Sequence, residues 1–115
     1  MTANDNLGIY LGYSSNSNII LGNSVTANFD GIVLRSSSTN TVSENNVTAN
    51  NYDGIFLDSS SNNTFSGNSL MTNNYYGIWL VNSLNNTFYH NNLINNTHQV
   101  YIDTLDSVDI WDDGS

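Results

Sequence analysis

The sequence predicts an all-β fold: a single-stranded parallel β-helix of about 4–5 coils with three short strands in each coil. The phrase Gly-Ile-x-Leu begins at residues 8, 31, 54 and 77, so it recurs every 23 residues. Apolar residues alternate with polar ones in short runs and never keep the roughly 3.6-residue spacing of a helix. Asparagine also returns at fixed points of every repeat. A period of this length is typical of units that stack on one another.

The first predicted strand of each coil is the Gly-Ile-x-Leu phrase itself. Its Ile and Leu side chains point to one face and the residue between them points to the other, which is the pattern of a half-buried strand. A degenerate fifth copy occupies residues 99–102 and starts one residue early. We therefore expect five stacked strands on this side of the solenoid.

The second and third strands are predicted from two further series of apolar residues. The second series is Ile20, Val42, Phe65 and Phe88, and the third is Val25, Val47, Leu70 and Leu93. Spacings within these series vary between 22 and 23 residues. The slips fall in turns rich in Asn, Ser and Gly, so the strand register is kept, as a buried face requires.

The repeats divide the chain into coils at approximately 8–30, 31–53, 54–76 and 77–98, with a partial coil at 99–115. We expect Val108 and Ile110 to supply a last second-strand segment. The whole of residues 1–115 is predicted to be one β-helix domain. Neither end shows a capping segment, so we expect a slice of a longer solenoid whose open ends favour end-to-end self-association.

Asparagine forms three series, each at one point of the repeat: Asn18, Asn40, Asn63 and Asn86; Asn23, Asn45, Asn68 and Asn91; Asn4, Asn28, Asn50, Asn73 and Asn96. Asn tolerates the backbone conformations of a tight corner and bonds to local backbone groups. In stacked coils the side-chain amides can also bond to one another. We therefore expect asparagine ladders at the corners.

Composition excludes several classes of partner. The chain has one basic residue, Arg35, against ten acidic ones, so it lacks the cations that bind nucleic acid or an anionic membrane surface. It has no Cys, which excludes disulfides and thiolate metal sites. No apolar run approaches the roughly 20 residues of a membrane-spanning helix.

Three phrases resemble NosD-like proteins, also called carbohydrate-binding and sugar-hydrolase (CASH) domains. They are Asn-Tyr-Asp-Gly-Ile-Phe-Leu (51–57), Ser-Ser-Asn-Asn-Thr-Phe (60–65) and Ile-Trp-Asp-Asp-Gly (110–114). The resemblance implies a right-handed solenoid, as the usual crossover of parallel strands also does. It further implies an extracellular, cell-surface or periplasmic protein of archaea or bacteria. The family includes a copper-site accessory protein, surface-layer-associated proteins and polysaccharide-modifying enzymes.

The outward residues of the first strand form a largely aromatic stripe: Tyr10, Val33, Phe56, Trp79 and Tyr101. Aromatic faces can dock sugar rings, and an exposed apolar stripe suggests an interaction site. We predict carbohydrate binding through Tyr10, Phe56, Trp79 and Tyr101. The alternative is that the stripe only stabilises the sheet through cross-strand pairs.

The acidic residues and histidines suggest no catalytic or metal site. Asp30 and Asp53 occupy equivalent positions on neighbouring coils, where they could bind Ca²⁺ or act as an acid–base pair. Asp is also a common turn residue, which is the interpretation we prefer. A tail of Asp103, Asp106, Asp109, Asp112 and Asp113 is interpreted as a solvated end, with Ca²⁺ binding as the alternative. His90 and His98 fall on different strands, which does not favour copper.

Two further surface features follow from the repeat. Arg35 and Asp58 are predicted to form an exposed salt bridge between adjacent coils. Four sequons make Asn46, Asn62, Asn85 and Asn95 candidate glycosylation sites, although a chain rich in Asn and Thr also produces sequons by chance.

We therefore expect a non-catalytic secreted or surface module that binds polysaccharide or another surface protein through the aromatic stripe, without a cofactor. Two alternatives stay open. The chain could be the scaffold of a lyase, hydrolase or epimerase whose catalytic residues lie elsewhere, or a copper-site accessory protein of NosD type.

Overall fold

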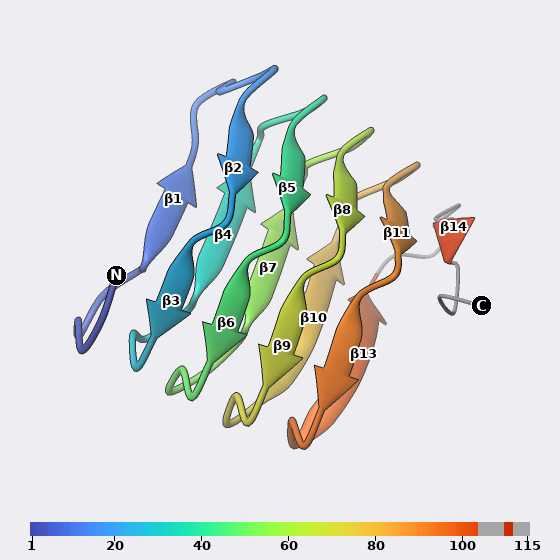
Figure 1. Cartoon of the computed structure of the whole chain (residues 1–115). Helices are drawn as coiled ribbons and strands as arrows, with labels where there is room; N and C mark the ends of the chain where they lie inside the picture. The colour runs from blue at the N-terminus through green and yellow to red at the C-terminus, as the bar shows by residue number, and fades with distance from the viewer. Residues whose placement is uncertain (104–109, 112–115) are drawn as a thin grey trace.

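The structure is a computed structural model that describes residues 1–103 and 110–111. These residues form strands that lie in three parallel sheets (Figure 1). The first sheet contains β1 (Ile9–Leu11), β4 (Ile32–Arg35), β7 (Ile55–Asp58), β10 (Tyr76–Val81) and β13 (His98–Asp103). The second contains β2 (Ile19–Leu21), β5 (Thr41–Ser43), β8 (Thr64–Ser66), β11 (Thr87–Tyr89) and β14 (Ile110–Trp111). The third contains β3 (Ser24–Thr26), β6 (Asn46–Thr48), β9 (Ser69–Met71) and β12 (Asn92–Ile94).

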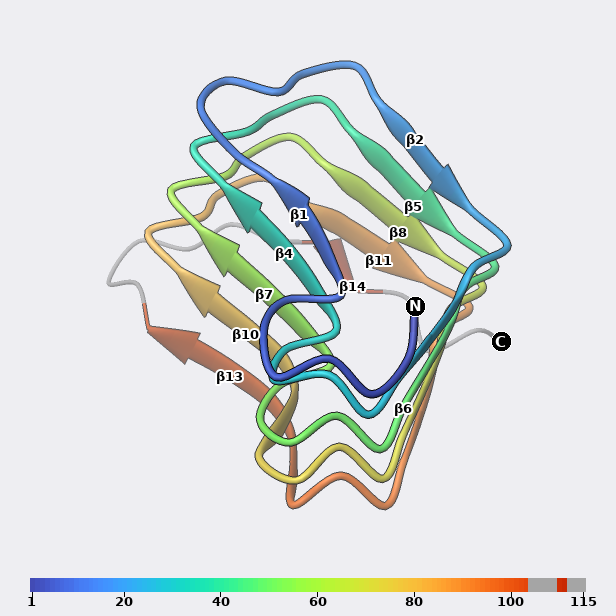
Figure 2. The same ribbon diagram turned by 90° about the vertical axis from the view of Figure 1, so that its left-hand side faces the viewer.

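Every strand pairs in parallel with the equivalent strand of the next coil, which confirms the predicted β-helix. Figure 2 looks nearly along the stack and shows successive coils lying over one another. Ile9 pairs with Ile32, and Ile32 pairs with Ile55. Ile110 lies in a last second-sheet strand, as expected: in β14, Ile110 pairs with Thr87 and Trp111 with Phe88. Val108 lies outside the described residues.

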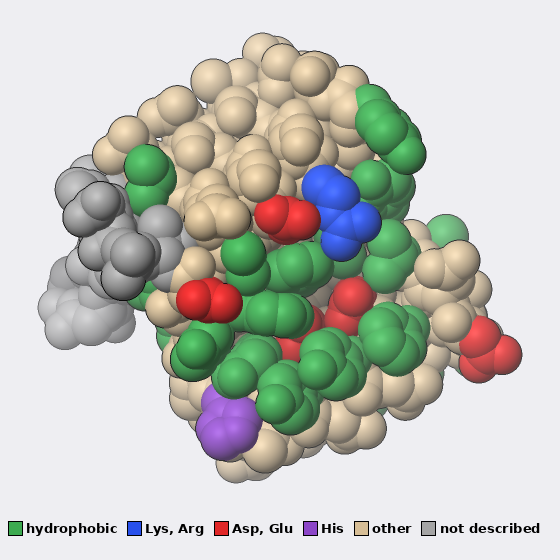
Figure 3. All heavy atoms as spheres, turned by 180° about the vertical axis from the view of Figure 1, so that it is seen from behind, with side chains coloured by type: hydrophobic (Ala, Val, Ile, Leu, Met, Phe, Trp, Pro, Cys, Tyr) green, Lys and Arg blue, Asp and Glu red, His purple; other side chains and the backbone are tan. Residues whose placement is uncertain are grey.

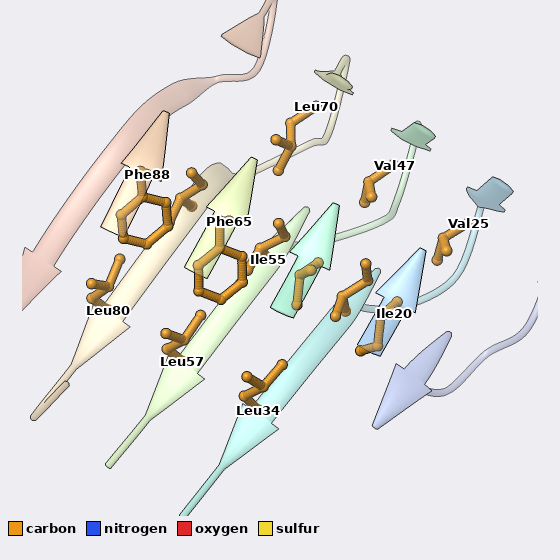
Figure 4. Close-up of a cluster of buried hydrophobic side chains, with 13 residues drawn as sticks. Ile20, Val25, Leu34, Val47, Ile55, Leu57, Phe65, Leu70, Leu80 and Phe88 are labelled. Carbon is orange, nitrogen blue, oxygen red and sulfur yellow. The ribbon is translucent and has the colours of Figure 1, made fainter. Parts of the chain in front are cut away.

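The core fills the space between the three sheets (Figure 4). Each coil contributes two apolar side chains from its first strand and one from each of the other two strands. Ile32, Leu34 and their equivalents on the next two coils are completely buried. Phe65 and Phe88 stack with ring centroids 4.7 Å apart and planes 8° apart. The Ile and Leu positions of the first sheet likewise stack on identical residues of the next coil, and each coil depends on its neighbours for burial.

Asparagine ladders hold the corners, as the sequence predicts. Asn63 is typical: its Oδ1 accepts hydrogen bonds from the backbone N–H (2.8 Å) and the Nδ2 (3.1 Å) of Asn40. Its own Nδ2 donates to the Ser37 carbonyl at 3.2 Å and to Asn86 Oδ1 at 3.1 Å. All four hydrogen-bonding positions of the buried amide are thus satisfied. Asn4, which the repeat predicts to extend the third ladder, instead donates to the Leu7 carbonyl.

The glycine of the repeated phrase lies where neighbouring coils approach closely. A Cβ atom on Gly31 would lie 2.5 Å from the Gly54 carbonyl oxygen and 2.5 Å from Val47 Cγ1. The same contact recurs one coil further, where a Cβ on Gly54 would lie 2.7 Å from the Gly77 carbonyl oxygen. The recurrence of glycine is therefore a packing requirement.

Within residues 1–103 and 110–111, no helix is long and apolar enough to cross a membrane. Arg35 and Asp58 form the expected bridge between coils, with Arg35 Nε 3.3 Å from Asp58 Oδ2.

Candidate ligand-binding face

The predicted aromatic stripe lies on the outside of the first sheet, and we call it the strand file. Tyr10, Val33, Phe56, Trp79 and Tyr101 are successive register partners across β1, β4, β7, β10 and β13. Phe56 and Trp79 stack with centroids 4.6 Å apart. Tyr10 and Tyr101, at the two ends, are 40% and 44% exposed. The structure thus brings the four proposed carbohydrate-binding residues into one line.

Val33 departs from the expected exposed stripe because it is only 1% exposed. Its register partners are Tyr10 on one side and Phe56 on the other. The small side chain of Val33 is shielded from solvent between the two larger ones, so Val33 does not add to the exposed stripe. Arg35 also covers part of this region, with its Cζ 5.9 Å from the centroid of the Phe56 ring.

A second aromatic row, which the sequence analysis missed, runs beside the strand file. It consists of Phe29, Tyr52 and Tyr75, and we call it the turn file. Phe29 and Tyr52 stack at 5.5 Å, and Tyr52 and Tyr75 at 4.6 Å. Backbone bonds fix these turns, since Tyr52 N–H donates to Phe29 O at 2.8 Å and Tyr75 N–H to Tyr52 O at 2.9 Å. The 23-residue spacing of positions 29, 52 and 75 was the available signal.

Between the two rows lies a third series, the middle file, made of Asp30, Asp53 and Tyr76. Figure 3 shows this face, with acidic atoms set between two rows of hydrophobic side chains. We call the space between the rows the groove. Tyr76 closes it at one end, because its ring stacks on Tyr101 at 5.1 Å and meets Tyr75 edge-on at 4.5 Å. The groove therefore has aromatic walls, an acidic floor and an aromatic end.

The two carboxylates of the floor accept hydrogen bonds from backbone N–H groups. Asp30 Oδ1 accepts the Asp53 N–H at 3.0 Å, and Asp53 Oδ1 accepts the Tyr76 N–H at 3.0 Å. Burial raises the pKa of both groups, and that of Asp53 reaches about 7, with the charge of Asp30 contributing. The N–H bonds oppose the rise, as does Arg35 in the case of Asp30. The backbone hydrogen bonds support the interpretation of Asp30 and Asp53 as turn residues. Their burial nevertheless disfavours the charged form of each carboxyl group.

Two buried polar atoms on this face have no hydrogen-bond partner: Asp53 Oδ2, an acceptor, and Trp79 Nε1, a donor. Unsatisfied buried groups are rare in folded proteins, and each calls for an explanation such as a bound water, ion or ligand. Asp53 belongs to the middle file and Trp79 to the strand file. One of the unsatisfied groups is therefore on the floor of the groove and the other on its wall.

Side chains that could bind a metal ion do not gather in threes in the part of the chain that the structure describes. No group of three His, Cys, Asp or Glu residues lies close enough to hold a metal ion within residues 1–103 and 110–111. His98 is the first residue of β13 in the first sheet, whereas His90 follows β11 in the second sheet. The remaining aspartates proposed for Ca²⁺, Asp106, Asp109, Asp112 and Asp113, lie outside the described residues.

The four sequon asparagines, Asn46, Asn62, Asn85 and Asn95, are all exposed. Asn62 and Asn85 have left-handed backbone conformations, with φ of 59° and 57°, at equivalent corners of adjacent coils. Glycosylation at these four positions stays a prediction.

Comparison with known proteins agrees with this architecture. The periplasmic alginate epimerase AlgG superimposes with a TM-score of 0.75 and 30% sequence identity, over 90% of this chain and 26% of the epimerase. A double mutant of AlgG gives a TM-score of 0.80 and 31% identity over the same shares. The chain thus spans about a quarter of the epimerase. A comparison with curated proteins finds no match.

The family comparison covers the whole chain. Residues 1–115 match the family described as "Periplasmic copper-binding protein (NosD)". Because this family and the epimerase are both periplasmic, the chain is located in the periplasm or outside the cell. The repeats, the parallel β-helix and the family match over all residues agree, and the chain belongs to the NosD family as a right-handed β-helix segment.

Proposed function

We propose that the chain is a non-catalytic module that binds a polysaccharide along the groove between the strand file and the turn file. The observation that carries this proposal is the pair of parallel aromatic rows on one face. Aromatic rings present flat apolar surfaces to the C–H faces of sugars, while Tyr and Trp add polar edges. Rows that repeat about every 4.8 Å along the axis suit a ligand that is itself a long chain.

The comparison with AlgG supports a carbohydrate ligand without naming it. The epimerase is described as acting on alginate, a polysaccharide, and shares about a quarter of its length with this fold. Fold alone does not carry function. The aromatic side chains of this particular chain therefore remain the main argument.

Binding can be tested by titrating polysaccharides into the protein while the fluorescence of its two tryptophans, Trp79 and Trp111, is recorded. Tyr52→Ala removes the centre of the turn file and leaves Trp79 as reporter. We expect a saturable change in the wild type and roughly two- to tenfold weaker binding in Tyr52→Ala, the range of a lost aromatic contact. Tyr89→Ala is the matched control, because Tyr89 lies on β11 in the second sheet. Equal losses in both variants, or no response to any polysaccharide, would overturn the proposal.

The likeness to AlgG favours one second candidate, in which the chain is part of a carbohydrate-active enzyme. Epimerisation of a uronate requires removal of a proton next to a carboxylate and a cation to hold that carboxylate. Arg35 is the chain's one Lys or Arg side chain, and it already contacts Asp58. Incubation with alginate in D₂O, followed by NMR, distinguishes the two, since an active site would incorporate deuterium at C5.

A copper role, by analogy with the family description, finds less support. His90 and His98 belong to different faces, and no three potential ligands converge among the described residues. Copper titration followed by histidine NMR would show simultaneous shifts of both imidazoles if such a site formed.

A further inference from the structure

We propose that the groove selects uncharged sugar chains and disfavours uronate or sulfated ones. This inference rests on the proposed polysaccharide binding and specifies its ligand class. It does not depend on the fold comparison. The ligand class that it predicts is uncharged, whereas the epimerase is described as acting on alginate, which is anionic.

The first argument is the charge of the groove. Its floor carries Asp30 and Asp53, which are 7% and 0% exposed and thus poorly screened by solvent. The sole nearby cation among the described residues, Arg35, is engaged by Asp58 at 3.3 Å and lies over Phe56. The protein as a whole has a formal net charge of −9. A chain with one carboxylate or sulfate per sugar would meet like charge both on approach and in the groove.

The second argument is the pair of unsatisfied atoms. Asp53 Oδ2 needs a donor and Trp79 Nε1 needs an acceptor. A sugar hydroxyl is both a donor and an acceptor, so the hydroxyl groups of an uncharged chain can donate to Asp53 Oδ2 and accept from Trp79 Nε1. The ionised carboxylate or sulfate of an anionic chain accepts only, so that wherever this group takes the place of a hydroxyl beside Asp53 Oδ2, the atom is left without a donor. Rejection of a ligand that leaves a buried group unpaired is a strong source of specificity.

The groups around Asp53 make the selectivity depend on pH. Asp30 faces it from the turn before β4, Tyr52 belongs to its own turn, and Tyr76 contributes from β10. Arg35 of β4 acts on Asp30. When Asp53 is protonated it becomes a donor and loses its charge, so both arguments against an anionic ligand weaken. The preference for uncharged chains should therefore be larger at pH 8 than at pH 5.

The test compares dissociation constants of galactomannan and hydroxyethyl cellulose with those of alginate and polygalacturonate, at a fixed ionic strength. For the wild type at pH 8 we expect the uncharged chains to bind at least about tenfold more tightly, since a like-charge contact is strongly unfavourable. At pH 5 the ratio should shrink. The Asp30→Asn/Asp53→Asn variant should lose most of the preference at pH 8, because both introduced amides keep an acceptor for the backbone N–H groups while the negative charges are gone.

Glu44→Gln serves as the control, because it removes a negative charge from the turn between β5 and β6, on another side of the solenoid. Circular dichroism of each variant shows whether the coils are intact. Tighter binding of alginate than of galactomannan, or an unchanged preference in the double variant, overturns the inference while leaving polysaccharide binding in place. Absence of binding to all four polysaccharides overturns the proposed function and this inference together.

Discussion

Replacing Asp53 by Asn should make the protein more stable at neutral and alkaline pH. The Asp53 side chain is fully buried, and burial together with the charge of Asp30 raises its pKa from 3.8 to about 7. A carboxyl group with a raised pKa in the folded state binds its proton more tightly there than in the unfolded chain. Stability is therefore highest at low pH, falls as the pH rises from about 4 to about 7, and stays low above that range.

The size of the effect follows from the same shift. One pKa unit corresponds to about 1.4 kcal/mol, so the full shift would cost the folded protein about 4 kcal/mol above pH 7. Relaxation of the surrounding groups lowers the real cost of a buried charge, and we expect about 1–3 kcal/mol. The amide that Asp53→Asn introduces would keep an oxygen that accepts the Tyr76 N–H, so the backbone contact is retained.

The assay is urea denaturation followed by circular dichroism at pH 8 and pH 5. The lower value stays above the isoelectric point of about 4.1, where the protein would be least soluble. Asp53→Asn should be more stable than the wild type by about 1–3 kcal/mol at pH 8, and by roughly half as much at pH 5. Glu44→Gln removes the same charge from an exposed turn and should change stability by less than about 0.5 kcal/mol. A stability advantage of Asp53→Asn that does not vary with pH would refute the reasoning.

Three further substitutions test the packing of the coils. Asn63→Ala removes four ladder hydrogen bonds and should cost about 2–4 kcal/mol in urea denaturation, whereas exposed Asn51→Ala should cost less than about 0.5. Gly54→Ala places a Cβ 2.7 Å from the Gly77 carbonyl oxygen and should cost at least about 1–3 kcal/mol; an unchanged melting temperature would contradict the close approach. Phe65→Ala opens a cavity beside Phe88 and should cost about 3–5 kcal/mol, against little change for Ile19→Ala, whose side chain is 72% exposed.

The fold was predictable because each coil repeats the same physical problem. An inward Ile or Leu, a corner Asn and a close-approach Gly recur at fixed spacing, and this pattern has one consistent solution in three dimensions. The register of β4 on β1 and of β7 on β4 follows directly from the spacing of the Gly-Ile-x-Leu phrases. Asn4 was the exception, because the first residues do not continue the ladder geometry.

The candidate site was only half predictable. The strand file could be placed from alternation within the strand, but the burial of Val33 depends on the size of Tyr10 and Phe56 on neighbouring coils. The turn file was missed because Phe29, Tyr52 and Tyr75 sit in turns, where alternation gives no signal. That Asp30 and Asp53 accept backbone N–H groups is a matter of corner geometry, which residue type alone does not determine.

Side chains that differ between coils are the better guide to function in such a solenoid. The ladders and the core fix the backbone, so an outward position can vary from coil to coil without changing the fold. In the middle file the outward position holds two acids followed by Tyr76. Burial of the Asp53 charge and the unsatisfied Asp53 Oδ2 both reduce the stability of the folded chain. A structure selected for stability alone would not keep such a cost on a face lined by two aromatic rows. Local departures from a consistent pattern are expected where a protein binds or reacts, and the groove is where this chain departs most from its own repeat.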